Sequence, residues 1–446
     1  MDDTIAAIST SPSIGAISIV RVSGKDAVNI VNKITDIDLK NVQSHSISYA
    51  HIINKDEVID EVLLMTMLAP KTYTTEDTIE INCHGGFSTT RKVLELLLSS
   101  GARLAEPGEF TKRAFLNGRI NLLEAESVND LITAKTDAAR TMAINNVDGI
   151  LTKKIHNIRE KIAKILANIE VNIDYPEYTD ELEVTTDLMH EYLADITKEL
   201  DSLVKGSKNG RLIKDGVKVA IIGKPNVGKS SILNHLLDEE KAIVTNIPGT
   251  TRDIVEGSIS LNGVEVNFID TAGIRETKDT VEKLGVQKSK KTADNSDLVL
   301  LVLNNNEKLT KEEKEMLDVY NKDNVIIFVN KSDLDKKLEL ERPFITGNTK
   351  DLNGLDSLKE EIIKKLELDS IVNKDMSYLS NIRQIDLINK ANESIKNANK
   401  SLNAGMSVDL IEIDLKNAWE YLGEITGESY KDELVDIIFS NFCLGK

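Results

Sequence analysis

The feature that most constrains the fold of this chain is a glycine-rich segment, GKPNVGKSS, at residues 223–231. It follows the apolar run VKVAIIG and precedes the helical run ILNHLL, so it has the GxxxxGK[ST] pattern in a strand–loop–helix setting. Backbone amides around Gly223 and Gly228 can surround phosphate at a helix N-terminus, where the helix dipole favours anions. We therefore predict a P-loop in which Lys229 reaches the β- and γ-phosphates and Ser230 binds Mg²⁺.

Two further motifs follow the P-loop, and each ends an apolar strand: DTAG at residues 270–273 and NKSD at residues 330–333. We expect Asp270 to hold Mg²⁺ through water and the amide of Gly273 to meet the γ-phosphate. The Asp333 carboxylate can accept hydrogen bonds from the N1 and N2 hydrogens of guanine, a pair that adenine does not offer. Together the three motifs predict a site for GTP rather than ATP.

The predicted GTP site extends over the P-loop, a following TNIPGTT segment and the two later motifs. The stem of Lys331 can cover the face of the base. The residues expected to contact GTP are Asn226, Val227, Gly228, Lys229, Ser230, Ser231, Thr245, Asn246, Ile247, Pro248, Gly249, Thr250, Thr251, Asp270, Thr271, Ala272, Gly273, Asn330, Lys331 and Asp333. The segment ITGNTK, with Thr346 and Gly347, departs from the usual Ser-Ala-Lys-like stretch and stays outside this set.

The residue that orients the attacking water is not evident from the motifs. Many small GTPases have a glutamine directly after DxxG, but Ile274 stands there and cannot orient water. Spacing identifies no arginine finger, although Arg252 and Arg275 stay open as candidates. Either of two later glutamates, Glu276 and Glu282, could orient water, and either could be an ordinary loop charge.

An oxygen-rich segment offers another source of charge stabilisation. TNIPGTTRD, residues 245–253, supplies hydroxyls and free carbonyls, and Thr251 is the natural second Mg²⁺ ligand. Asn226 lies within the P-loop, next to the predicted position of the phosphates. Oxygen ligands of this kind suit a hard monovalent cation that bridges phosphates in place of an arginine.

The pattern of apolar and polar residues along the chain predicts a multidomain protein. In it, an α/β P-loop GTPase domain is inserted into a discontinuous α-helical domain. Residues 1–118 mix short β-type runs with one helical run, which indicates an α+β domain. Residues 119–210 and 372–446 are helical, and residues 211–371 alternate apolar strands with helices, as in a parallel sheet covered on both faces. In the first helical part Pro176 should break a helix whose apolar seam is Leu151, Ile155, Ile158, Ile162, Ile165 and Ile169.

Composition limits the class of protein. The 446 residues carry a net charge of −18, which argues against non-specific coating of nucleic acid and requires any such partner to meet a local basic patch. No apolar run is long enough to span a membrane, and the acidic N-terminus does not have the form of a signal peptide. Two cysteines, Cys83 and Cys443, fit a reducing cytosol, so we expect a cytoplasmic location.

The order of these motifs, together with the terminal CLGK at residues 443–446, resembles the tRNA-modification GTPase family called MnmE or TrmE over essentially the whole chain. The resemblance implies a homodimer joined through N-terminal domains that bind 5-formyl- or methylene-tetrahydrofolate. It also implies a heterotetramer with the FAD-dependent partner MnmG (GidA), and modification at C5 of the wobble uridine (U34) of certain tRNAs to an aminomethyl or carboxymethylaminomethyl group. Hydrolysis of GTP would depend on K⁺ as well as Mg²⁺.

The resemblance also assigns roles to particular residues of this chain. It implies Mg²⁺ ligands at Ser230 and Thr251, and makes Glu282, rather than Glu276, the acid that orients water. The K⁺ ligands would be Asn226, Thr245, Ile247 and Thr250, and the folate-binding residues would be Arg21, Glu80, Arg119 and Lys446. Arg119 stands where relatives commonly have lysine, which keeps the charge but changes the geometry.

Several alternatives stay open at this point. Cys443 is a possible nucleophile, but a small packing residue near a helix end is at least as reasonable. A ribosome-assembly or regulatory switch GTPase would share the Asn-bearing P-loop and the apolar residue after DxxG. Two further alternatives are a folate-binding dimer whose GTP hydrolysis only regulates assembly, and a scaffold protein without catalytic activity.

Overall fold

The computed structural model describes residues 3–11, 13–174, 179–239, 257–270, 293–351, 354–371, 376–429 and 432–445. The chain forms two compact units. The first combines Met1–Asn129, Ile155–Val171 and Ser407–Lys446, and the second combines Asp130–Lys154 and Asn172–Met406. Each unit is thus built from segments that lie far apart in the sequence.

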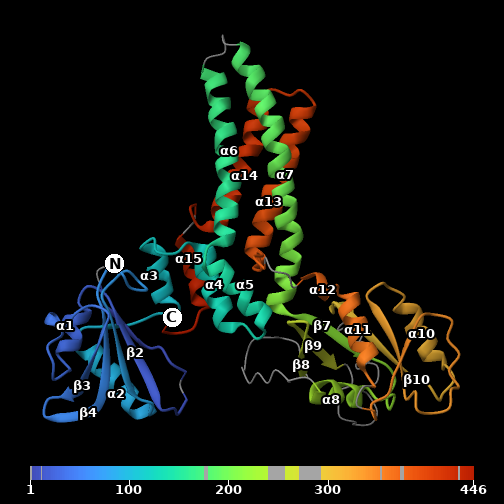
Figure 1. Cartoon of the computed structure of the whole chain (residues 1–446), viewed down its shortest axis with the longest axis horizontal. Helices are drawn as coiled ribbons and strands as arrows, with labels where there is room; N and C mark the ends of the chain where they lie inside the picture. The colour runs from blue at the N-terminus through green and yellow to red at the C-terminus, as the bar shows by residue number, and fades with distance from the viewer. Residues whose placement is uncertain are drawn as a thin grey trace. The chain divides into compact units, whose positions relative to one another are not determined.

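A six-stranded mixed sheet forms the N-terminal part of the first unit (Figure 1). Its strands lie in the order β3-β4-β5-β2-β1-β6, and all neighbours are antiparallel except β1 and β6. The strands are β1 (Ile5–Ile8), β2 (Ile17–Ser23), β3 (Ser46–Asn54), β4 (Glu57–Met67), β5 (Thr78–His84) and β6 (Arg103–Leu104).

One face of this sheet is covered by the helices α1 (Ala27–Asn32) and α2 (Phe87–Ser99). The buried residues on that face follow the two-residue period of strands and include Val20, Val22, Ile79 and Ile81. The opposite face carries more exposed side chains, among them Ile17, Tyr49 and Leu63. On that opposite face, Phe110 of a later helix packs against Ile5 and Ala7 of β1. Helices packed against a mainly antiparallel sheet confirm the predicted α+β class.

The first unit also contains all or most of several helices from the N-terminal, middle and C-terminal parts of the chain. The elements are η1 (Leu39–Asn41), α3 (Glu109–Leu116), α4 (Leu122–Thr133), α6 (Ile150–Asp174), α14 (Val408–Thr426) and α15 (Asp432–Ser440). The six residues of the predicted seam on α6 are each at most 1% exposed, which confirms that helical face. Pro176 lies outside the described residues, and its expected helix break stays a prediction.

The second unit contains a sheet in the order β12-β11-β10-β7-β9-β8. Its strands are β7 (Val217–Ile222), β8 (Gly257–Leu261), β9 (Val264–Asp270), β10 (Leu298–Asn304), β11 (Val325–Asn330) and β12 (Ile345–Thr346). All neighbours are parallel except β8 and β9, which form an antiparallel hairpin at the edge. The all-parallel prediction therefore missed this hairpin, whose turn residues Asn262 and Gly263 both have positive φ, as a type I′ turn requires.

Both faces of this sheet are buried, as predicted. Every residue of β10 is buried, and residues of β7 alternate between two cores, with Val219 and Ile221 in one and Ala220 and Ile222 in the other. The helices of the unit are α5 (Asp137–Val147), α7 (Thr179–Asp215), α8 (Lys229–Glu239), α10 (Lys311–Val319), α11 (Asp356–Lys365), α12 (Leu368–Ile371) and α13 (Ile382–Asn403). Across the described ranges, no helix is both long and apolar enough to cross a membrane.

Candidate functional site: a P-loop and a second polar site

The P-loop lies at the point where the strand order of the second sheet reverses. Strand β7 is first in sequence but central in space, with β9 on one side and β10 on the other. The loop after β7 leads directly into α8, whose first residue is Lys229. In open α/β sheets, ligands bind outside the carboxyl ends of the strands at such a reversal.

Two glycines allow the loop to pass close to its neighbours. Gly223 has φ +147°, and a Cβ there would lie 2.5 Å from the carbonyl oxygen of Val302 on β10. Gly228 has φ +100°, and a Cβ there would lie 2.2 Å from Nδ2 of Asn330. These positions therefore exclude any side chain, which explains both glycines of the motif.

The lysine of the P-loop motif is held against the loop backbone. Lys229 is 7% exposed, and its Nζ donates to the carbonyl oxygens of Gly223 at 2.8 Å and Lys224 at 2.7 Å. Ser230 and Ser231 are exposed in the first turn of α8. An ammonium group, two hydroxyls and the helix N-terminus thus gather at one place, an arrangement that suits a phosphate chain.

The NKSD motif contacts the P-loop directly. Nδ2 of Asn330, which is 2% exposed, donates to the carbonyl oxygen of Val227 at 2.9 Å. Nζ of Lys331 donates to the carbonyl oxygen of Asn226 at 3.1 Å. The side chains of Asn330 and Lys331 therefore connect two of the predicted motifs, a role in positioning the loop that sequence spacing did not predict.

An ion pair joins Asp333 to Lys350 of the ITGNTK segment, which the sequence analysis set aside. Nζ of Lys350 lies 2.5 Å from Oδ2 of Asp333. This hydrogen bond holds the pKa of Asp333 below its usual value and raises the pKa of Lys350. Asn348 fixes the turn, because its Oδ1 accepts from the backbone amides of Lys350 and Asp351. Ser332 also donates its backbone amide to the carbonyl oxygen of Gly347, so the two loops are hydrogen-bonded to each other.

Asp270 is the last residue of β9 and pairs in register with Ile221 of β7, so its backbone lies beside the start of the P-loop. The other predicted nucleotide and metal residues lie outside the described residues: Thr245, Asn246, Ile247, Pro248, Gly249, Thr250, Thr251, Thr271, Ala272, Gly273 and Glu282. The alternatives Arg252, Arg275 and Glu276 also lie outside them, as does the apolar Ile274. Among the described residues, no group of three or more His, Cys, Asp or Glu side chains could hold a metal ion.

A second polar site lies on the N-terminal sheet and brings together residues from the two ends of the chain. Arg21 and Glu80 face each other across β2 and β5, with Nη2 and Oε1 2.7 Å apart. Nη1 of Arg21 also donates to the carbonyl oxygen of Gly445 at 3.3 Å, and Oγ of Ser9 donates to the same oxygen at 3.0 Å. Lys446, the next residue, lies outside the described residues.

Arg119 contacts a different group of residues. Its guanidinium lies 4.7 Å from the centroid of the Tyr73 ring, and Nη1 donates to the carbonyl oxygen of Tyr73 at 3.1 Å. No hydrogen bond between described residues joins Arg119 to Arg21 or Glu80. Arg119 lines two hollows, one of about 510 Å³ with Lys71 and Tyr73, and one of about 390 Å³.

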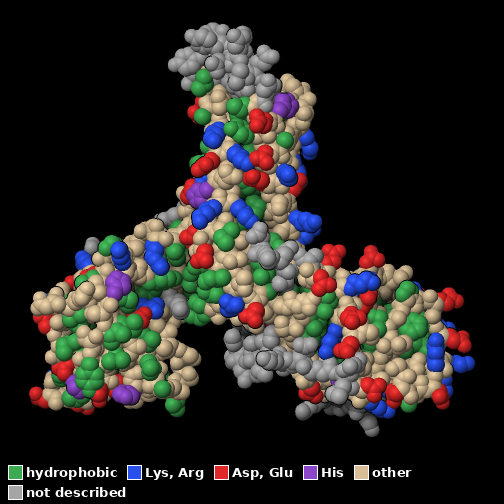
Figure 2. Space-filling view, viewed as in Figure 1, with side chains coloured by type: hydrophobic (Ala, Val, Ile, Leu, Met, Phe, Trp, Pro, Cys, Tyr) green, Lys and Arg blue, Asp and Glu red, His purple; other side chains and the backbone are tan. Residues whose placement is uncertain are grey.

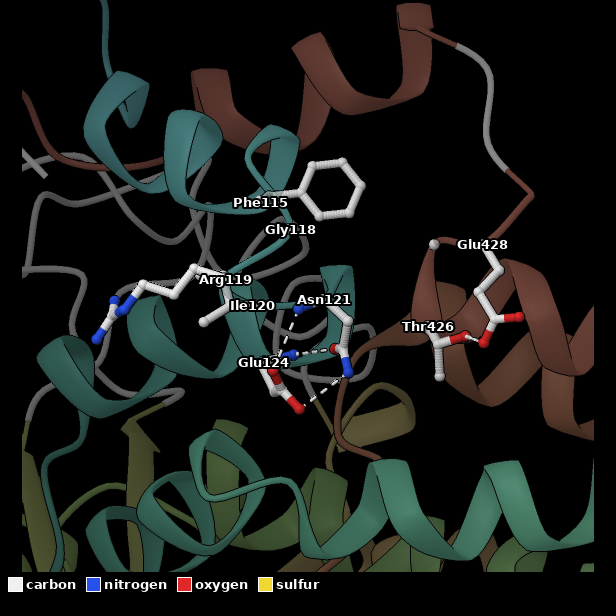
Figure 3. Close-up of a pocket in the computed structure, with 9 residues that line it drawn as sticks. Phe115, Gly118, Arg119, Ile120, Asn121, Glu124, Thr426 and Glu428 are labelled. Atoms are coloured by element: carbon white, nitrogen blue, oxygen red, sulfur yellow. Dashed lines mark hydrogen bonds between the residues drawn. The ribbon is translucent and has the colours of Figure 1, made fainter. Parts of the chain in front are cut away.

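Figure 3 shows the smaller hollow, in which the Arg119 side chain points away from the hydrogen-bonded pair Asn121 and Glu124. Asn121 donates through Nδ2 to Oε1 of Glu124 at 2.9 Å, so this pair starts α4. Thr426 and Glu428 line the opposite side. The polar side chains that line this hollow are hydrogen-bonded in pairs, Asn121 with Glu124 and Thr426 with Glu428.

A buried ion network near this region was not predicted. Arg113 of α3 has no exposed side-chain surface and contacts Asp3, Glu76 and Glu109. Burial alone would raise the pKa of Glu109, but hydrogen bonds from Arg103 and Arg113 and from the backbone outweigh it and lower the pKa. The network fixes α3, which precedes Arg119.

The two cysteines differ in accessibility. Cys443 is exposed, and its carbonyl oxygen accepts from the backbone amide of Gly108 at 3.3 Å. Cys83 is buried on β5, and burial raises the pKa of its thiol to about 12. Exposure leaves Cys443, not Cys83, as the cysteine that can meet a reactant.

Comparison with known proteins identifies the family. Residues 4–119 match the description "GTP-binding protein TrmE N-terminus", and residues 122–443 match "MnmE helical domain". A "tRNA modification GTPase MnmE" from Streptococcus thermophilus is 52% identical over 100% of this chain and 98% of its own length. Proteins of the same name are 51% identical in Ligilactobacillus salivarius and 50% in Streptococcus agalactiae, with the same coverage. The chain therefore belongs to the tRNA modification GTPase MnmE family.

Proposed function

We propose that this chain binds GTP with Mg²⁺, hydrolyses GTP to GDP and phosphate, and couples the hydrolysis to modification of tRNA. The observation that carries the proposal is the convergence of two motifs: Asn330 and Lys331 of NKSD bond to the backbone of the P-loop. In the proposed site, Lys229 binds the β- and γ-phosphates, Ser230 binds Mg²⁺ and Asp333 selects guanine. The other predicted GTP contacts belong to the same proposal.

The metal ions fit the donors that the chain supplies. The Ser230 hydroxyl is exposed at the start of α8, and Asp270 ends the neighbouring strand, which supports Mg²⁺ between them and the phosphates. Asn226 is exposed with φ +65°, so the P-loop offers an amide oxygen beside the phosphates. Bound there, a K⁺ ion would supply positive charge to the transition state. We propose K⁺ ligands at Asn226, Thr245, Ile247 and Thr250, a second Mg²⁺ ligand at Thr251, and Glu282 as the acid that orients water.

The N-terminal site suits a ligand with a paired donor and acceptor. The Arg21–Glu80 pair holds a guanidinium and a carboxylate side by side on the sheet face opposite α1 and α2, each about one sixth exposed in its side chain. We propose that Arg21, Glu80, Arg119 and Lys446 bind a tetrahydrofolate that supplies the one-carbon unit. We propose further that the chain forms a homodimer and acts with MnmG (GidA) on C5 of U34. In this scheme the domains are 1–118, 119–210, 211–371 and 372–446.

The base-specificity part of the proposal is tested with Asp333→Asn, using Asp335→Asn as the matched control because Asp335 is exposed in the same loop. The asparagine amide cannot accept both guanine hydrogens, but it can donate to the 2-oxo group of xanthine. We expect GDP affinity to fall at least about tenfold and xanthosine diphosphate affinity to rise, with the control unchanged. Titration with fluorescent nucleotides measures both. Unchanged GDP affinity in Asp333→Asn would remove Asp333 from the site.

The K⁺ proposal is tested by the GTP turnover rate in K⁺ and in Na⁺ at equal ionic strength. We expect faster turnover in K⁺, and loss of that difference in Asn226→Ala. Glu282→Ala should reduce turnover by orders of magnitude without changing nucleotide affinity, because Glu282 would act only on the water. Equal turnover in both cations contradicts the K⁺ proposal, and a comparable loss in Glu276→Ala instead would move the acid to that position.

A further inference from the structure

The last three turns of α7 carry a concentration of positive charge that the proposed function does not use. Residues 202–214 contain four cations and no carboxylate, in a chain whose net charge is −18. Three of the cations, Lys205, Lys208 and Arg211, are spaced three residues apart and are exposed. We refer to these three residues as the α7 basic face.

Helix geometry places the three side chains together on the outside of α7. Each step of three residues turns about 60° short of a full circle, so the three cations span roughly a third of the helix circumference over about 9 Å. The opposite side is packed: a Cβ on Gly206 would lie 2.8 Å from the Tyr378 ring, and one on Gly210 would lie 2.3 Å from the Leu379 carbonyl oxygen. The basic face therefore points away from the segment that packs against α7.

Little negative charge offsets this face. Arg211 has only a long contact of 3.9 Å with Asp215, and neither Lys205 nor Lys208 forms an ion pair with a described residue. The nearest acidic position toward the N-terminus of α7, Asp201, is paired with Lys396 of α13 at 2.7 Å. Figure 2 shows Lys and Arg side chains together with Asp and Glu side chains along the long helices, so the uncompensated charge of this face is inferred from the ion pairs given above.

We propose that the α7 basic face contacts the phosphate backbone of tRNA. A polyanion approaching a chain of net charge −18 is repelled unless it meets a local positive surface, and this face supplies one. Between residues 202 and 214 the described surface has no exposed large apolar side chain. Protein–protein interfaces depend on such anchors, whereas phosphate contacts do not, so the chemistry of the face favours RNA. The proposal rests on the proposed coupling to tRNA modification, but not on the assignments at the nucleotide or folate sites.

The test compares two double variants of the full-length protein. Lys205→Gln/Lys208→Gln removes two charges from the basic face, and Lys311→Gln/Lys314→Gln removes two exposed charges of the same spacing from α10, where glutamates surround them. The affinity for fluorescently labelled unmodified tRNA is measured by anisotropy over a series of salt concentrations. GTP turnover and the thermal unfolding midpoint are measured for each protein.

We expect the α7 variant to bind tRNA roughly tenfold more weakly near 0.1 M salt, and its log–log salt slope to become shallower by about 1.5 to 2. The α10 control should match the wild type, and GTP turnover and unfolding should be unchanged in both. Equal weakening in both variants would mean a general charge effect and would overturn the proposal. Unchanged tRNA affinity in the α7 variant would also overturn the proposal. This holds even if the same variant loses binding to an acidic protein.

Discussion

Replacing Asn330 tests how the NKSD motif supports the P-loop. The Asn330 amide donates to the Val227 carbonyl oxygen at 2.9 Å, and Val227 is 3% exposed. Asn330→Asp keeps the size of the side chain but removes this donor, leaving a buried carbonyl without its partner. Such a loss costs about 1–3 kcal/mol. The carboxylate also repels the carbonyl oxygen, so the upper part of that range is expected.

This cost should appear in nucleotide affinity. In the variant the loop can relax until water reaches the Val227 carbonyl, and nucleotide binding must reverse that relaxation. At about 1.4 kcal/mol per factor of ten, the upper part of this range, about 2–3 kcal/mol, lowers GDP affinity by about 30-fold to 150-fold. Titration with a fluorescent GDP analogue measures the change. Asn321→Asp, which is exposed in the same unit, serves as the control and should bind GDP as the wild type does.

Asn330→Ala separates the hydrogen bond from the added charge, because it removes the donor without introducing a carboxylate. We expect its GDP affinity to lie between those of the wild type and Asn330→Asp. Wild-type GDP affinity in Asn330→Asp would refute the reasoning, because it would show that the bond to Val227 does not hold the loop in its binding geometry.

Three further results are expected. Lys350→Met should tighten GDP binding by a few-fold at low salt, because Lys350 and guanine both use the Asp333 carboxylate; weaker GDP binding in a titration would contradict this. Gly228→Ala should abolish GDP binding in the same titration, since its Cβ would lie 2.2 Å from a buried amide and its φ is +100°. Glu109 has a lowered pKa in the folded state, so its contribution to stability is present above pH 4.5 and is lost as the pH falls through the folded pKa. The wild type should therefore lose its advantage in thermal unfolding midpoint over Glu109→Gln as the pH falls below 4.5; a constant difference would contradict this.

Much of the fold could be predicted from periodicity. The apolar seam of α6 and the continuous apolar run of β10 are both buried, because burial on one helix face or on both sheet faces leaves a regular pattern. The hairpin of β8 and β9 was missed although its signal was present: Asn262-Gly263 between apolar residues is typical of a two-residue turn. The sequence next to this turn was instead interpreted as part of a parallel sheet, by analogy with the apolar strands around it.

The candidate sites show a different limit of sequence reasoning. The motifs predicted which residues surround a nucleotide, because their spacing depends on strand ends. They did not predict the contacts between motifs, such as Asn330 with Val227 or Lys350 with Asp333, because these join loops whose approach is set by the sheet. Likewise, Arg21 and Glu80 were chosen by resemblance alone, and their register opposite each other became evident only once β2 and β5 were paired.

The carbonyl oxygen of Gly445 accepts hydrogen bonds from Ser9 and from Arg21, which lies 424 residues earlier. Proteins are synthesised from the N-terminus at about 5–20 residues per second, so roughly 20 to 85 s separate the emergence of these partners from the ribosome. During that interval the N-terminal sheet is present without the segment whose Gly445 carbonyl oxygen finally accepts a hydrogen bond from Arg21. The segment that contains Gly445 therefore adds its contacts with Ser9 and Arg21 only after the N-terminal sheet has been synthesised.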